Sequence, residues 1–169
     1  MNTLRKLLQI RWFRLVVEVL LVILVLFAVR FWTQRDMVSG TVPEFQGNLL
    51  NGESYALLAD KRRPLLIHFW ASWCPMCELE QGSIQSISDD HAVITIAMQS
   101  GEAEEVIAYM QQEKLQFPVI NDSEGILARR FGVHAVPSSF VIDENNNIMF
   151  RETGFTTETG LRLRLWLAK

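Results

Sequence analysis

The sequence of 169 residues has only two cysteines, Cys74 and Cys77, and three histidines that are scattered along the chain. Structural zinc sites take four Cys or His ligands, often as two pairs. Covalent haem attachment needs a histidine directly after C-x-x-C, and the residue after Cys77 is Glu78. These absences argue against structural zinc and exclude attached haem, so neither a cofactor nor a resident metal is expected.

Basic charge is scarce outside the N-terminus. Residues 1–30 hold five lysines and arginines and one acid, which leaves eleven basic and eighteen acidic residues in 31–169, a net charge of −7. Such a domain has too little positive charge to neutralise phosphates, so nucleic acid is excluded as a partner. With 49% hydrophobic residues and no repeats, the chain has room for one packed domain and a small appendage.

One long hydrophobic run stands near the N-terminus. Residues 15–29, LVVEVLLVILVLFAV, are apolar except for Glu18. Extended from Trp12 to Trp32, the run forms about 31 Å of helix, which matches the hydrocarbon core of a bilayer. Four basic residues precede the run and two closely follow it. The positive-inside rule therefore places the N-terminus in the cytoplasm and the following domain outside it.

No clear A-x-A-like cleavage site follows this run; the nearest approximation is Val38-Ser39-Gly40. An uncleaved anchor is therefore expected, although a cleaved signal peptide would export the domain as well. The expected divisions are a basic cytoplasmic segment (1–14), a transmembrane anchor (15–32), a polar linker (33–41) and a folded domain (42–169).

Strands and helices alternate in the rest of the chain. An Asn-Gly turn at 51–52 predicts a hairpin. Strands are expected over 64–70, 92–98, 117–120, 138–143 and 148–153, and helices over 75–89, 101–114, 123–131 and 156–168. This order predicts an α/β sandwich around a mixed central sheet.

The cysteine pair lies between a buried strand and a helix. Because Cys74 comes where the helix begins, backbone N–H groups and the positive helix end favour its thiolate, which is the attacking species. Cys77 follows one helical turn later and is placed to resolve a mixed disulfide. A structural disulfide of this spacing would close a very small loop and stabilise little. The pair is therefore predicted to be a redox couple, with Trp73 as an aromatic surface for a docking chain.

These residues resemble a known fold. FWASWCPMC (69–77) is similar to the thioredoxin-fold signature FWAxWCxxC, and GVHAVPSSFVID (132–143) resembles the segment that carries its cis-proline. The resemblance implies a thioredoxin-like fold over residues 42–169. It also implies that Pro137 is the cis-proline and that Val136 and Pro137 hold an extended substrate.

Glu80, the third residue after Cys77, resembles the CxxCxxE form of the membrane-tethered TlpA/ResA-like branch. Within it, SGEAEEV, FPVIND and LRLRLWLAK are most similar to the anchored thioredoxin-like member of the suppressor-of-copper-sensitivity group. The resemblance implies a bacterial inner-membrane protein that reduces or exchanges disulfides on the periplasmic side, in cytochrome maturation or copper stress. Its implied partners are a membrane-embedded electron donor and a cysteine-containing periplasmic protein.

Two ionisable residues are candidates for proton transfer. His68 lies six residues before Cys74, where thioredoxins carry a buried acid and TlpA-like relatives usually an Asn. A neutral histidine there can accept the proton of Cys77, or it can be a hydrogen-bonded core residue. Glu80 shares a helix face with Cys77 and can shuttle protons, or it can be an acid favoured by the early helical turn.

Two other functions stay open at this point. The two thiolates can bind Cu(I), with Met76 as a soft third ligand. The same fold can also act as an oxidase that makes disulfides, because the dipeptide Pro75-Met76 does not by itself fix the reduction potential.

Overall fold

The computed structural model describes the backbone of residues 2–169 and the side chains of residues 12–25, 27–29 and 34–169. The chain divides into two compact units, residues 1–35 and residues 36–169. The first unit is a single helix, α1 (Asn2–Gln34), in which Trp12–Val29 is long and apolar enough to cross a membrane. The second unit is an α/β domain.

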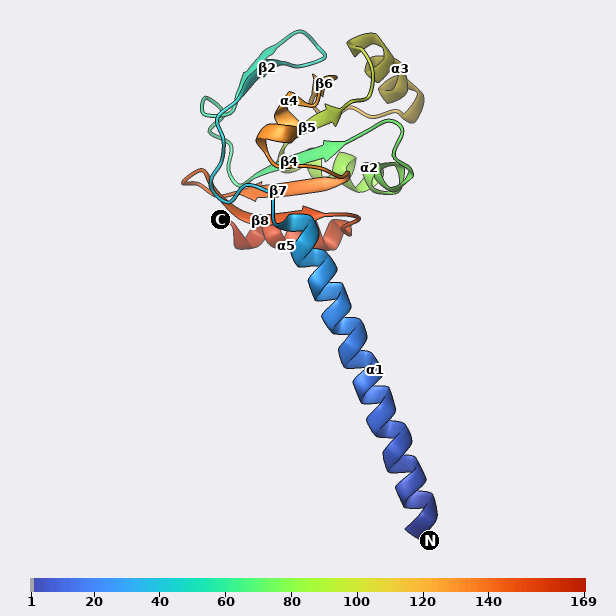
Figure 1. The fold of residues 1–169 in the computed structure, drawn as a ribbon. Helices are drawn as coiled ribbons and strands as arrows, with labels where there is room; N and C mark the ends of the chain where they lie inside the picture. The colour runs from blue at the N-terminus through green and yellow to red at the C-terminus, as the bar shows by residue number, and fades with distance from the viewer. Residues whose placement is uncertain (1) are drawn as a thin grey trace. The chain divides into compact units, whose positions relative to one another are not determined.

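The domain contains two sheets and four helices (Figure 1). The strands are β1 (Gly40–Thr41), β2 (Gln46–Asn48), β3 (Ser54–Ala56), β4 (Leu65–Trp70), β5 (Ala92–Met98), β6 (Val119–Asp122), β7 (Ser138–Ile142) and β8 (Asn147–Thr153). The helices are α2 (Pro75–Ser88), α3 (Ala103–Glu113), α4 (Ile126–Arg130) and α5 (Glu158–Leu167).

The main sheet has six strands in the order β1-β8-β7-β4-β5-β6. β4, β5 and β6 run parallel, whereas β7 is antiparallel to β4, and β8 is antiparallel to β7. The predicted mixed sheet is thus confirmed, as is the hairpin at Asn51-Gly52, which joins β2 to β3.

The central strand β4 is buried along its whole length and supplies both faces of the core. Leu66 and Trp70 belong to a first cluster, which α2 and α5 cover. Leu65, Ile67 and Phe69 belong to a second cluster on the opposite face, which α4 and the segment before β4 cover. This two-sided burial explains why residues 64–70 read as a continuous apolar run rather than an alternating one.

Within the range expected as a polar linker, several residues pack into the domain. Met37 is 3% exposed and lies in the second cluster. Gly40 and Thr41 form β1, which pairs with Ile148 and Asn147 at the start of β8. The domain therefore begins to fold immediately after α1.

Several elements differ in extent from their predicted ranges, and β6 and α4 show the reasons. β6 begins at Val119 rather than at residue 117, because Pro118 has no N–H to donate to the sheet. α4 begins at Ile126, after Gly125 in a left-handed conformation. The Asp122 carboxylate accepts hydrogen bonds from the N–H groups of Leu127 (3.0 Å) and Ala128 (2.8 Å), so the end of β6 caps α4.

Candidate active site

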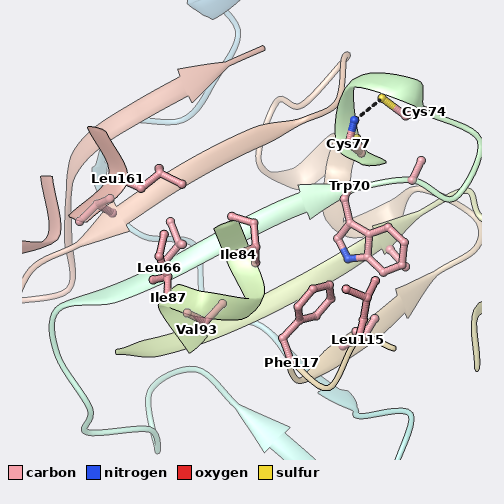
Figure 2. Close-up of a cluster of buried hydrophobic side chains, with 14 of the residues drawn as sticks. Leu66, Trp70, Cys74, Cys77, Ile84, Ile87, Val93, Leu115, Phe117 and Leu161 are labelled. Atoms are coloured by element: carbon pink, nitrogen blue, oxygen red, sulfur yellow. Dashed lines mark hydrogen bonds between the residues drawn. The ribbon is translucent and has the colours of Figure 1, made fainter. Parts of the chain in front are cut away.

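The loop between β4 and α2 places both cysteines at the start of α2. Cys74 is the N-cap residue, and its sulfur accepts a hydrogen bond from the Cys77 N–H at 3.4 Å (Figure 2). Both residues are free thiols and are nearly buried, at 7% and 3% exposure. Pro75 occupies the first helical position, as the sequence predicts. The N-terminus of α2 and the Cys77 N–H thus face the Cys74 sulfur.

The segment before β7 lies against Cys74. The peptide bond between Val136 and Pro137 is cis, as expected from the resemblance. The Cys74 thiol donates a hydrogen bond to the Val136 carbonyl at 3.4 Å. The Pro137 carbonyl accepts from the Gly154 N–H at 2.8 Å, which ties the β8–α5 loop to the same site. The backbone of Val136 is therefore next to the sulfur that an extended substrate must approach.

Glu80 is fully buried in α2, one helical turn beyond Cys77. Neither of its carboxyl oxygens has a hydrogen-bond partner among the described residues. Burial raises the pKa of Glu80 to about 7, and the backbone N–H of Thr156 only weakly opposes this shift. That N–H makes no hydrogen bond to either oxygen, so the carboxyl is unpaired among the described residues.

Cys77 lies in an environment that disfavours its thiolate. Burial raises the pKa of the Cys77 thiol well above its ordinary value, and hydrogen bonding with Cys74 and the charges of Cys74 and Glu80 raise it further. Attack by Cys77 therefore requires a base to remove its proton.

His68 lies in the centre of β4 and is 2% exposed. Its Nδ1 is 2.9 Å from the Ser139 hydroxyl on the neighbouring strand β7. Burial lowers the pKa of His68 to about 3, so the ring is neutral at physiological pH. A buried histidine needs a hydrogen-bond partner, and Ser139 supplies one. This contact fits the role of a core residue, which the sequence left open as the alternative to proton transfer.

Exposed apolar side chains lie close to the cysteines in the sequence and in the loop that bonds to Pro137. Trp73 is 60% exposed, and its indole N–H donates to the Gln99 carbonyl at 2.9 Å. Met76 and Leu79 are exposed on the first two turns of α2. Phe155 is exposed in the β8–α5 loop, next to Gly154 and Thr156. Together they form an apolar rim on which a polypeptide can dock.

Phe155 and Thr156 were not among the residues predicted from the sequence. The loop that contains them reaches the site because Gly154 bonds to Pro137 and Thr156 approaches Glu80. In the sequence, the signal for this loop was an aromatic residue, Phe155, next to Gly154 between a predicted strand and a predicted helix. Local sequence, however, does not show which loops converge in space.

The described residues contain no group of three or more His, Cys, Asp or Glu side chains that could hold a metal ion. Met76, considered above as a ligand for Cu(I), lies in the first turn of α2 and is 45% exposed. The sulfur atoms at the site are otherwise those of the two cysteines, whose arrangement is that of a pair able to form and break one disulfide.

The fold and this pair define a thioredoxin-like protein disulfide oxidoreductase. Residues 38–151 match the AhpC/TSA family, and the chain belongs to that family. A thioredoxin-like protein of Haemophilus influenzae is 28% identical over 130 residues, which cover 76% of this chain and 75% of that protein.

Two further similar proteins are a relative named for its activity and a protein of known structure. The thiol-disulfide oxidoreductase ResA of Geobacillus thermodenitrificans is 26% identical over 164 residues, covering 90% of this chain and 94% of that protein. The crystal structure of StoA from Bacillus subtilis superimposes with a TM-score of 0.63 at 28% identity, covering 74% of this chain and 96% of that one. The chain is thus a thiol-disulfide oxidoreductase of the type that includes ResA and DsbE.

Proposed function

We propose that this oxidoreductase reduces or exchanges disulfides in cysteine-containing exported proteins on the periplasmic side of a bacterial inner membrane. The observation that carries the proposal is the contact between Cys74 at the N-terminus of α2 and the Val136 carbonyl. It supports an attack by Cys74 on a substrate that lies extended along Val136 and Pro137.

The first step uses Cys74. Its thiolate attacks one sulfur of the substrate disulfide, and a mixed disulfide forms between Cys74 and the substrate. The other substrate sulfur leaves as a thiolate and takes up a proton. Trp73 and the rest of the apolar rim hold the substrate chain during this step.

The second step uses Cys77 with Glu80 as its base. The Glu80 carboxylate removes the Cys77 proton, and the new thiolate attacks the Cys74 sulfur. The substrate's second thiol is released and the Cys74–Cys77 disulfide forms, so that two electrons pass to the substrate. A carboxyl with a pKa of about 7 is suited to this transfer near neutral pH. His68, whose Nδ1 is 2.9 Å from the Ser139 hydroxyl, is a second candidate for accepting this proton.

The CxxCxxE pattern that ends at Glu80 and the state of the Cys77 thiol support electron flow from this pair to the substrate. A strong oxidant of this fold is one whose reduced form is stabilised. Here burial and the nearby Glu80 raise the pKa of the Cys77 thiol, so the reduced form gains no stability from a Cys77 thiolate. The pair is therefore expected to give up electrons, and a membrane-embedded donor is expected to restore them.

The N-terminal helix supports the proposed location. Trp12–Val29 has the length and composition of a transmembrane anchor, and the basic residues that precede it support a catalytic domain outside the cytoplasm. A tether of this kind keeps the enzyme beside a donor in the same membrane.

The equilibrium reduction potential of the full chain in detergent tests the direction. The Cys74–Cys77 couple would be titrated against glutathione and dithiothreitol buffers, with Cys77→Ser as the variant that cannot form the disulfide. We expect a value of about −230 mV or lower. A value of about −120 mV would identify an oxidase that makes disulfides.

A further inference from the structure

Helix α5 has apolar side chains on two opposite faces. Its inner face is buried in the first core cluster through Leu161 and Leu165. Its outer face has three exposed apolar residues at spacings of three and four, Leu163 (54%), Trp166 (62%) and Leu167 (50%). We call these three residues the outer stripe. The outer face of a helix in a soluble domain is normally polar, and a contiguous exposed apolar patch marks an interaction surface.

The charged groups on either side of the outer stripe are neutralised. Arg162 pairs with Asp90 at 2.7 Å and with Glu158 at 2.8 Å. Arg164 pairs with Glu152 at 2.8 Å. Glu158 is the single acidic residue of α5, and it is paired with Arg162. The helix therefore presents no unpaired carboxylate beside the outer stripe.

Basic side chains gather at the C-terminal end of the outer stripe. Lys169 lines a surface hollow together with the basic run 61–63. Asp89 and Asp90 line the same hollow; Asp90 pairs with Arg162, and Arg62 of the basic run pairs with Asp60 at 2.8 Å. An apolar stripe that contains tryptophan and borders on basic groups is the composition of helices that lie in the interface of a bilayer with anionic lipids.

The chain that follows α1 enters the domain against β8, the strand before α5, on the face of the sheet opposite to α5. Only two residues separate Gln34, the end of α1, from the buried Met37, so the backbone between them spans at most about 10 Å. The Met37 carbonyl accepts a hydrogen bond from Arg151, and its sulfur accepts one from Thr153 at 3.1 Å. Both donors belong to β8, which leads through residues 154–157 into α5.

We propose that the outer stripe of α5 lies in the interface of the membrane that α1 crosses, with Leu163 and Leu167 at the acyl boundary and Trp166 among the headgroups. This proposal rests on the proposed anchoring and goes beyond it, because a tether alone does not orient the domain. The N-terminal end of α5 follows Thr156, which approaches Glu80. Docking along α5 would fix the orientation of the domain relative to the proposed membrane-embedded donor.

Tryptophan quenching in nanodiscs tests this arrangement. The full chain, one copy per nanodisc of phosphatidylethanolamine and phosphatidylglycerol, would be compared in ordinary and brominated lipid. Subtracting the emission of Trp166→Phe from that of the wild type isolates Trp166. Trp12→Phe isolates a residue of the anchor in the same way, and Trp73→Phe isolates an equally exposed tryptophan at the active site.

We expect brominated lipid to quench most of the emission of Trp166 and of Trp12, and to leave that of Trp73 unchanged. Replacing Leu163 and Leu167 by Ser should restore the Trp166 emission in brominated lipid. Quenching of Trp12 without quenching of Trp166 would overturn the proposal and leave the anchoring intact, and a blue-shifted, unquenched Trp166 would assign the stripe to a protein surface. An unquenched Trp12 would contradict the anchoring itself.

Discussion

Glu80 shows what spacing can and cannot predict for a single residue. Its position three residues after Cys77 identified it as a candidate for proton transfer, with the alternative of an acid that is favoured by the early helical turn and has no catalytic role. The structure buries both oxygens without a hydrogen bond, which favours the first alternative. Burial depends on packing between α2 and the β8–α5 loop, and no local pattern contains that contact.

The burial of Glu80 makes stability depend on pH. Folded Glu80 keeps its proton up to about pH 7, whereas the unfolded residue loses it near 4.5. The folded state therefore loses stability as the pH rises through this window, by about 3 kcal/mol at most.

Glu80→Gln removes this dependence. We expect the variant to be more stable than the wild type at pH 8 and similar to it at pH 4, as measured by urea unfolding. It should also resolve mixed disulfides more slowly, since an amide cannot accept the Cys77 proton. Glu78→Gln, at an exposed position of the same helix, is the control. Equal pH profiles for wild type and Glu80→Gln would contradict the proposed state of the carboxyl.

At the scale of elements, strands and helices followed from periodicity, whereas contacts distant in sequence did not. The range 33–41 is polar and gave no sign that Met37 packs in the core or that β1 pairs with β8. The same holds for the neighbourhood of Gly132, where residues 36–38 pass close to the chain that leads to Pro137. Val38 donates a backbone hydrogen bond to Phe131 at 3.1 Å.

Gly132 tests how tightly this segment is held. It has a φ of +65°, and a β-carbon there would lie 1.8 Å from the Asp36 carbonyl oxygen. Gly132→Ala should therefore cost more than the roughly 1–2 kcal/mol of a left-handed alanine alone. Gly52→Ala, at φ +88° with nothing within 4 Å, supplies the matched control for urea unfolding. Equal losses of stability in the two variants would show that residues 36–37 are not held against Gly132.

At the scale of the whole molecule, the sequence predicted an apolar helix followed by a thioredoxin-like domain. The thioredoxin-like fold of the domain is confirmed. Charge distribution predicts the orientation, because basic residues concentrate before the run 15–29. Alkaline phosphatase fused after Lys169 should therefore be active in a bacterial host, and β-galactosidase at the same position inactive. The reverse pattern would place the domain in the cytoplasm.

The division of labour between the two cysteines can be tested with a peptide that contains one disulfide, analysed by intact mass. Cys77→Ser should accumulate a one-to-one mixed disulfide through Cys74, because the resolving thiol is missing. Cys74→Ser should accumulate almost none, since the Cys77 thiol is buried and its pKa is raised. The wild type should pass to the Cys74–Cys77 disulfide and release the reduced peptide. Equal or greater trapping by Cys74→Ser would show that Cys77 is the attacking thiol and would contradict the mechanism.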